Sequence, residues 1–191
     1  MKDPRGFVKL SATLEGVGAG AYLGGSQFLT TPSTIIAANA IGDTEARQNG
    51  WSTSAVMKTQ PWSGPFETPL TGSQAYSLAS QFIVNCPETN PELPFEVFPV
   101  LKLYGNIKPG SNVYVKYDNN EVSGDGLYMA FLTRLDVKYV PISNSRVTIP
   151  SELQGTVYAV VVCDDEGVED ENTVAGPVIL NFPYPSSANN Y

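Results

Sequence analysis

The stretch that decides the fold runs from Phe7 to Met57. It reads FVKLSATLEGVGAGAYLGGSQF over residues 7–28 and, after a break that contains Pro32, TIIAANAIGDTEARQNGWSTSAVM over residues 34–57. In both halves one stripe of residues recurs every three or four positions, at Phe7, Leu10, Leu14, Val17 and Ala21, and then at Ala38, Ile41, Glu45, Gln48, Ser52 and Ala55. This spacing is typical of an α-helix that packs one face on a core. We therefore expect two helices, one over residues 7–28 and one from Pro32 to about Met57.

Two members of the second stripe are polar, and the first helix carries a matching polar pair. Glu45 and Gln48 occupy positions that should face a core, where polar groups are costly unless they have partners. Glu15 and Tyr22 are seven residues apart, which is two helical turns, so they share one helix face. Glu-x6-Tyr on one helix and Glu-x-x-His on the next is the pattern with which ferritin-like bundles supply half of a di-iron site. In this chain Gln48 stands at the histidine position.

Four motifs carry a resemblance to a known family. They are LEGVGAGAYLGG at residues 14–25, DTEARQNGW at 43–51, PFETPLTGSQAYSLASQFIVNCP at 65–87 and NTVAGPVIL at 172–180. In this order they resemble the secreted fungal ferritin-like proteins of the stress-response or desiccation-related type. The resemblance extends from Phe7 to about Phe182. It implies half of a ferritin-like four-helix bundle that lacks the first helical pair, and it implies an extracellular location, with any signal peptide upstream of Met1.

The resemblance also implies metal ligands at Glu15, Tyr22, Glu45 and Gln48. The chain contains no histidine, and an amide oxygen is a poor iron ligand compared with an imidazole. We therefore expect a degenerate, empty site in which these side chains form a hydrogen-bonded network. The alternative is an iron or manganese site whose remaining ligands come from another chain.

The remaining sequence changes character twice. Residues 59–96 are rich in proline and read as a wrapping loop that contains a short helix at about 74–84, capped by Ser73. From residue 97 to 183, seven short segments of strand composition alternate with turns, which indicates an antiparallel immunoglobulin-like β-sandwich. Residues 184–191 read as a flexible tail. The expected fold class is α+β, with the helical pair at residues 1–58 preceding the sandwich.

Two cysteines, Cys86 and Cys163, allow one internal disulfide. In an oxidising compartment such a bridge would tie the helical part to the β part. The alternative is that one thiol is buried and the other pairs with a different segment or chain.

Residues 164–171 place six carboxylates in eight positions. Calcium binds oxygen ligands only, so Asp164, Asp165, Glu169 and Asp170 are candidate ligands of a calcium loop. The spacing matches no standard calcium loop, and the other interpretation is a solvated acidic loop.

Composition excludes several classes of function. The net charge of −8 is opposite to the basic surface that nucleic acids require, and it also disfavours anionic membrane surfaces. There is no apolar run of 18 residues, so no transmembrane helix is expected. Without histidine, a Ser-His-Asp or Cys-His catalytic site of the ordinary kind cannot form.

Three hypotheses remain. The first is a non-enzymatic, secreted structural or interaction protein that works as a homo-oligomer or with a missing upstream helical segment. The second is a ferritin-like metalloprotein that shares ligands between chains. The third is a module that binds carbohydrate or cell wall through exposed aromatic residues such as Trp62. We favour the first, because no catalytic motif stands out in the sequence.

Overall fold

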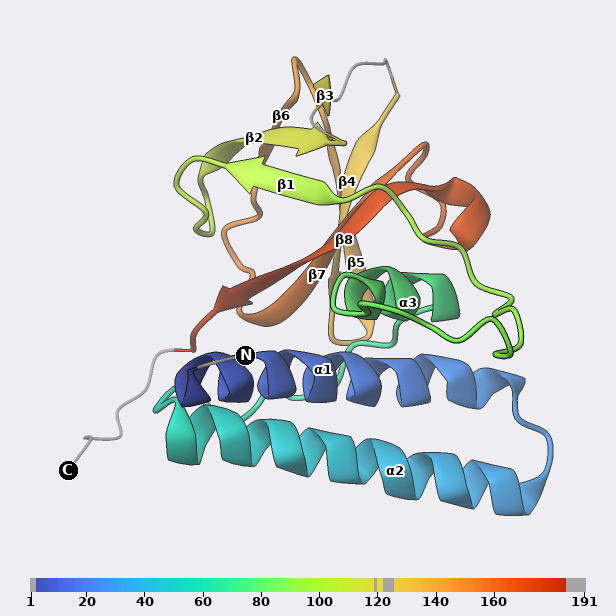
Figure 1. Cartoon of the computed structure of the whole chain (residues 1–191). Helices are drawn as coiled ribbons and strands as arrows, with labels where there is room; N and C mark the ends of the chain where they lie inside the picture. Colours follow the sequence, from blue (N-terminus) through green and yellow to red (C-terminus); the bar gives the residue numbers. More distant parts are fainter. Residues whose placement is uncertain (1–2, 119, 122–125, 185–191) are drawn as a thin grey trace.

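Two long helices form an antiparallel hairpin at the start of the chain (Figure 1). The computed structural model describes residues 3–118, 120–121 and 126–184. Helix α1 spans Pro4–Gly25 and α2 spans Pro32–Trp51. Asp3 caps α1 by accepting hydrogen bonds from the backbone N–H groups of Arg5 and Gly6, and each helix has a proline in its first turn, where its missing N–H costs nothing.

The helical stretches end near the predicted residues, 28 and about 57, but their last turns are not α-helical. Helix α1 begins three residues earlier than predicted because Asp3 supplies a cap, and it ends in a 3₁₀ turn, η1, at Ser26–Phe28. Helix α2 ends at Trp51 and continues as a π-helical turn, η2, over Ser52–Val56. Lys58, with a φ of 58°, then turns the chain out of the helix.

A proline-rich strap, residues 59–71, leads from the hairpin to a short helix. This helix, α3, spans Gly72–Ser80 and is capped by Thr71 in a capping box with Gln74. The prediction that Ser73 caps this helix was wrong. The Ser73 hydroxyl instead donates to Asp170 and accepts from the backbone N–H of Glu96, so Ser73 joins α3 to distant segments.

The second half of the chain folds into two four-stranded antiparallel sheets. In the first sheet β2 pairs with β1 on one side and with β3 and β6 on the other. The second sheet has the order β5-β4-β7-β8. The strands are β1 Leu101–Tyr104, β2 Asn112–Tyr117, β3 Asn120–Glu121, β4 Tyr128–Thr133, β5 Asp136–Pro141, β6 Arg146–Thr148, β7 Gly155–Val162 and β8 Thr173–Phe182, with a 3₁₀ turn, η3, at Asp170–Asn172 before β8.

Strand β7 is buried on both faces, as its sequence indicates. Residues 157–162 read VYAVVV without polar alternation, which is typical of a strand covered on two sides. Val157, Ala159 and Val161 belong to the core between the two sheets. Tyr158, Val160 and Val162 point to the opposite face, where they pack with residues of the strap, α1 and α3.

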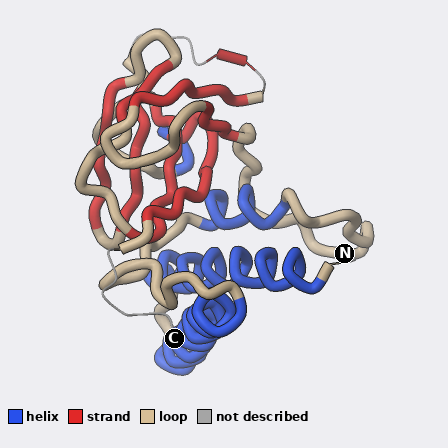
Figure 2. The backbone as a smooth tube through the Cα atoms, turned by 90° about the vertical axis from the view of Figure 1, so that its left-hand side faces the viewer, coloured by secondary structure: helices blue, strands red, loops and turns tan. Residues whose placement is uncertain are grey.

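Helix α1 therefore lies on the outer face of the second sheet, and α2 lies on the far side of α1 (Figure 1). Figure 2 shows the strands gathered at one end of the molecule and the hairpin at the other. Val17 packs in the hydrophobic cluster on the outer face of the second sheet. Phe7, from the same predicted stripe, is 61% exposed. No residue of α2 is buried. Of the second predicted stripe only Ser52, in η2, is buried. For its members in α2 the expectation that the stripe faces a core was wrong, because α1 and α3 already cover the sheet and α2 has only α1 to pack on.

The architecture confirms an α+β fold with a helical hairpin and antiparallel sheets. The expected tail at 184–191 lies, apart from Tyr184, outside the described residues. None of the helices in the described part of the chain combines the length and apolar character needed to span a bilayer.

Candidate functional site

The register of the hairpin brings three of the four predicted ligand residues together. Gly18 of α1 lies opposite Glu45 of α2, so closely that a Cβ at position 18 would collide with the Glu45 carboxylate. One turn earlier on α1, Glu15 lies opposite Gln48. The glycine therefore gives the Glu45 side chain the space it occupies between the helices.

Glu15, Glu45 and Gln48 form a hydrogen-bonded group that we call the carboxylate cluster. With its amide nitrogen turned toward Glu15, Gln48 donates to the two carboxylate oxygens at 2.7 and 3.0 Å. The carboxyl group of Glu45 lies within reach of the Glu15 carboxyl group, which acts on the Glu45 pKa. Burial raises the pKa of Glu45, and the hydrogen bond and negative charge of Glu15 raise it further.

This cluster does not fit the metal site that the resemblance implies. Gln48 presents nitrogen donors to Glu15, and an amide NH₂ cannot bind a cation. Among the described residues, no group of three or more histidine, cysteine, aspartate or glutamate side chains is arranged to hold a metal ion. Within this cluster, one chain thus offers a cation only the carboxyl groups of Glu15 and Glu45.

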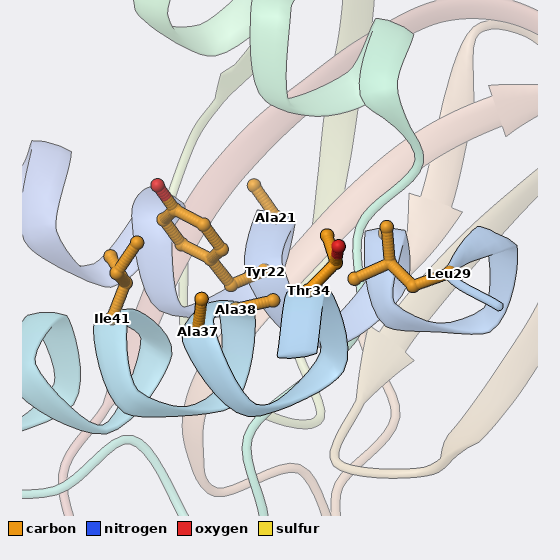
Figure 3. Close-up of a pocket in the computed structure, with 8 residues that line it drawn as sticks. Ala21, Tyr22, Leu29, Thr34, Ala37, Ala38 and Ile41 are labelled. Carbon is orange, nitrogen blue, oxygen red and sulfur yellow. The ribbon is translucent and has the colours of Figure 1, made fainter. Parts of the chain in front are cut away.

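Tyr22, the fourth predicted ligand, lies apart from the cluster. Its side chain packs against Gly42, with its Cβ 3.2 Å from where a Cβ of residue 42 would be. It lines an apolar groove of about 400 Å³ between the two helices. Figure 3 shows its ring above Ala37 and Ala38 of α2, with Ile41 to one side. Glu15 and Tyr22 do share a helix face, but the two turns between them place Tyr22 in apolar surroundings.

The comparison with family models agrees with the hairpin. Residues 1–58 match the model of the ferritin-like domain. A search of curated proteins found no match to the chain. The ferritin-like match ends where the strap begins, so it covers α1, α2 and η2 and leaves the strap and both sheets unmatched.

The ferritin-like hairpin has one long face that no other element among the described residues covers. We call it the open seam; along α2 it is formed by residues three or four positions apart, and from α1 it includes Glu15 and Tyr22. The apolar groove lies at one end, and a polar cleft of about 430 Å³ lies at the other. The α2 residues of the seam are Thr34, Ala37, Ile41, Thr44, Gln48 and Trp51.

Sequence reasoning missed three residues beside Glu15. Thr44, Arg47 and Trp51 line the polar cleft together with Glu15 and Gln48. Thr44 and Trp51 are four and three positions from Gln48, and this spacing was the available signal, since residues three or four apart on a helix are neighbours. Arg47 is in turn three positions from Thr44 and four from Trp51. That signal alone does not reveal that the face lacks a covering layer.

The acidic segment predicted as a calcium loop has a structural role. Asp170 accepts hydrogen bonds from the hydroxyls of Thr71 (2.9 Å) and Ser73, at the start of α3. Asp164 accepts from the backbone N–H of Glu166 and from Asn172, both at 3.0 Å. These carboxylates bind protein donors from different directions, and Asp165 and Glu169 are exposed. The segment ties β7, η3 and α3 together.

The predicted disulfide between Cys86 and Cys163 is not formed in this structure, where both are free and exposed. Cys163 follows β7 and its thiol lies 3.6 Å from an Asp164 oxygen. Cys86 lies in the irregular segment after α3. The contacts between Asp170 and α3 already make the connection that the bridge was expected to supply.

Proposed function

We propose that this chain is a non-enzymatic, secreted structural or interaction protein that assembles through its ferritin-like hairpin. In this proposal residues 1–58 are the assembly unit, 59–96 are the connecting segment and 97–183 are an immunoglobulin-like sandwich that the hairpin carries. The stress-response type and the fungal origin come from the resemblance of the four motifs. The hairpin works without a resident metal, because the carboxylate cluster does not fit one.

The observation that carries the proposal is the exposure of α2. A helix of 20 residues with none buried has little to stabilise it, since most helical stability in proteins comes from packing. Its exposed residues on the open seam include Ile41 (41% exposed) and Trp51 (64% exposed). Ferritin-like bundles cover such a face with two further helices.

We assign the covering layer to the hairpin of a second copy. Identical chains associate most simply about a two-fold axis, where each contact is made twice. The seam suits this geometry because its polar cleft carries both charges: the exposed Arg47 and the Glu15 carboxylate line it together. In a two-fold pair, Arg47 of each copy faces the Glu15 carboxylate of the other copy. Ile41 of each copy enters the apolar groove of the other copy.

Light scattering coupled to size-exclusion chromatography, with intact-mass analysis, tests the assembly. We expect a dimer for the unaltered chain and a monomer for Ile41→Glu, which places a charge in the seam. Asn39→Glu is the matched control, since it adds the same charge two positions away, on the opposite side of the helix. A 20.5 kDa monomer at all concentrations would overturn the pairing. A companion polypeptide found by mass analysis would replace the second copy with a separate helical segment.

The two cysteines test the extracellular location. An oxidising compartment favours disulfides, whereas reducing compartments keep thiols free. Because Cys86 and Cys163 are exposed and not joined to each other, a secreted chain is expected to carry them linked to a segment or chain outside this structure. Mass mapping of native material, alkylated without reduction, distinguishes the two cases, and two free thiols would contradict secretion.

A further inference from the structure

A second cleft lies away from the open seam, where the hairpin, the strap and the second sheet meet. It encloses about 220 Å³. Helix α1 contributes Lys9 and Gly16, the end of the second helix contributes Asn49 and Thr53, and β7 and β8 form the opposite wall. The strap closes it with residues 59–63 and Glu67. We call it the junction cleft.

The strap is held rigidly at this cleft. The backbone N–H of Thr156 donates to the Ser63 carbonyl at 2.7 Å, and the N–H of Tyr184 donates to the Gln60 side chain at 2.8 Å. Gly50 admits the Pro61 carbonyl, which would lie 2.7 Å from a Cβ at position 50. On this fixed strap Trp62 remains 61% exposed. An indole held at the rim of a polar cleft, and not buried, is placed to contact a ligand.

The lining carries hydrogen-bonding groups that the protein itself does not use. The Ser63 hydroxyl is buried and has no partner among the described residues. Asn181 accepts from the Thr156 hydroxyl at 3.1 Å, which leaves its amide N–H groups available. No hydrogen bond or ion pair within the described part of the chain engages the Glu67 carboxylate or the Lys9 ammonium group. Unused donors and acceptors that converge on one cavity indicate a polar ligand.

The buried Tyr158 also lines the cleft. It donates to the Gly16 carbonyl across a long 3.3 Å. Burial, and secondarily the negative charge of Glu67, raise the pKa of Tyr158, so the phenol keeps its proton. Tyr158 therefore contributes no charge to the cleft.

The geometry points to the junction cleft as a binding site for one ring of a neutral saccharide. A sugar ring presents hydroxyls at its edge, which pair with amide donors and a carboxylate acceptor, and C–H groups on its faces, which stack on an indole such as that of Trp62. One lysine and one glutamate balance in charge, which favours a neutral ligand. The volume is below the roughly 300 Å³ at which sites for drug-sized molecules begin, so a single ring fits. The π-helical turn η2 supports the assignment, because it lines the cleft with Thr53 and such turns are frequent at functional sites.

The test is an NMR titration of the full chain, labelled with ¹⁵N, with methyl glycosides of glucose, galactose, mannose and N-acetylglucosamine. We expect saturable shifts of the Thr156 and Asn181 amides with at least one glycoside, with a dissociation constant on the order of 1 mM, typical of a weak site. Trp62→Ala and Glu67→Gln should weaken binding at least about tenfold.

Phe66→Ala is the matched control. Phe66 lies on the same strap and is also 61% exposed, but it does not line the cleft, so its loss should leave affinity unchanged. Absence of saturable shifts for every glycoside up to about 50 mM would overturn the site, as would equal weakening by Trp62→Ala and Phe66→Ala. The site is independent of hairpin pairing, so Ile41→Glu should bind as the unaltered chain does. The amide spectrum of each variant shows whether it is folded.

Discussion

At the scale of single residues, Glu45 shows how one small neighbour decides a side chain's chemistry. Gly18 lets the carboxyl group lie between the helices, where it meets Glu15. Two carboxyl groups in contact cannot both ionise without repulsion, so one retains its proton to higher pH. The result is a raised pKa at a position that the sequence analysis had marked as an acid on a core-facing stripe and as a candidate metal ligand.

This raised pKa predicts a pH-dependent stability. The folded chain holds the Glu45 proton more tightly than the unfolded chain, so its contribution to stability is complete below the ordinary pKa of 4.5 and is lost as pH rises through the raised pKa. We expect Glu45→Gln to remove this dependence in thermal unfolding measured from pH 4 to 8. Asp43→Asn, an exposed acid on the same helix, is the control. Equal pH profiles for both variants and the unaltered chain would contradict the raised pKa of Glu45.

The side chain at position 48 leads to a prediction about how much metal the purified chain holds. We expect purified chain to hold less than one equivalent of iron or manganese, because only two carboxylates face each other and the amide nitrogen binds no cation. Gln48→His supplies an imidazole beside Glu15 and should raise the metal content measured by elemental analysis. A stoichiometric metal in the unaltered chain that is lost in Glu15→Ala or Glu45→Ala would contradict this interpretation.

At the scale of elements, α1 depends on small residues on the face that meets the strap. The N–H of Leu70 donates to the Gly20 carbonyl at 3.0 Å, and a Cβ on Gly24 would collide with the Leu70 backbone. Gly25, one position later, faces open space. Adjacent glycines of the same helix thus serve different purposes.

These neighbours give a matched pair of variants. Gly24→Ala should lower the free energy of unfolding by about 1 to 3 kcal/mol, because the strap backbone must move away and this outweighs the better helix propensity of alanine. Gly25→Ala should raise it by up to about 1 kcal/mol, since only the propensity changes. Urea denaturation measures both. If Gly24→Ala were as stable as Gly25→Ala, the close packing of α1 on the strap would be refuted.

The cap of α3 depends on a distant acid. Asp170→Ala removes the acceptor of the Thr71 and Ser73 hydroxyls and should cost about 2 to 3 kcal/mol in urea denaturation, since hydrogen bonds to a charged group are the stronger kind. Glu171→Ala changes an exposed acid of the same turn and should cost little. A similar loss in both variants would assign the effect to the overall charge of the acidic segment.

At the scale of the whole molecule, burial decreases from the sheets toward α2. Strand β7 is covered on both faces, α1 on one, and α2 has no buried residue. Local opening follows such differences. We expect hydrogen exchange to be slowest in β7, intermediate in α1 and fastest in α2 at low protein concentration, and to slow in α2 as concentration rises. Exchange in α2 that is slow and independent of concentration would argue against a covering second copy.

Much of the fold follows from the sequence because its causes are local. A helical period predicts α1 and α2, and short segments of strand composition between turns predict most of the strands. The unbroken apolar run at 157–162 requires cover on both faces of β7, which the structure provides. In each case the period of the backbone places neighbouring residues on a face, and no distant contact is needed.

Other features depend on contacts between residues far apart in the chain. In the sequence Asp170 is a candidate calcium ligand. In the structure it accepts hydrogen bonds from Thr71 and Ser73, nearly a hundred positions away. The resemblance makes Tyr22 a candidate metal ligand, but the register of the hairpin places its side chain against Gly42. The junction cleft exists only because the strap returns Trp62 and Ser63 to the start of β7. Sequence by itself therefore determined the elements and their order, whereas the tertiary structure decided which faces meet, because side-chain chemistry depends on neighbours that only packing supplies.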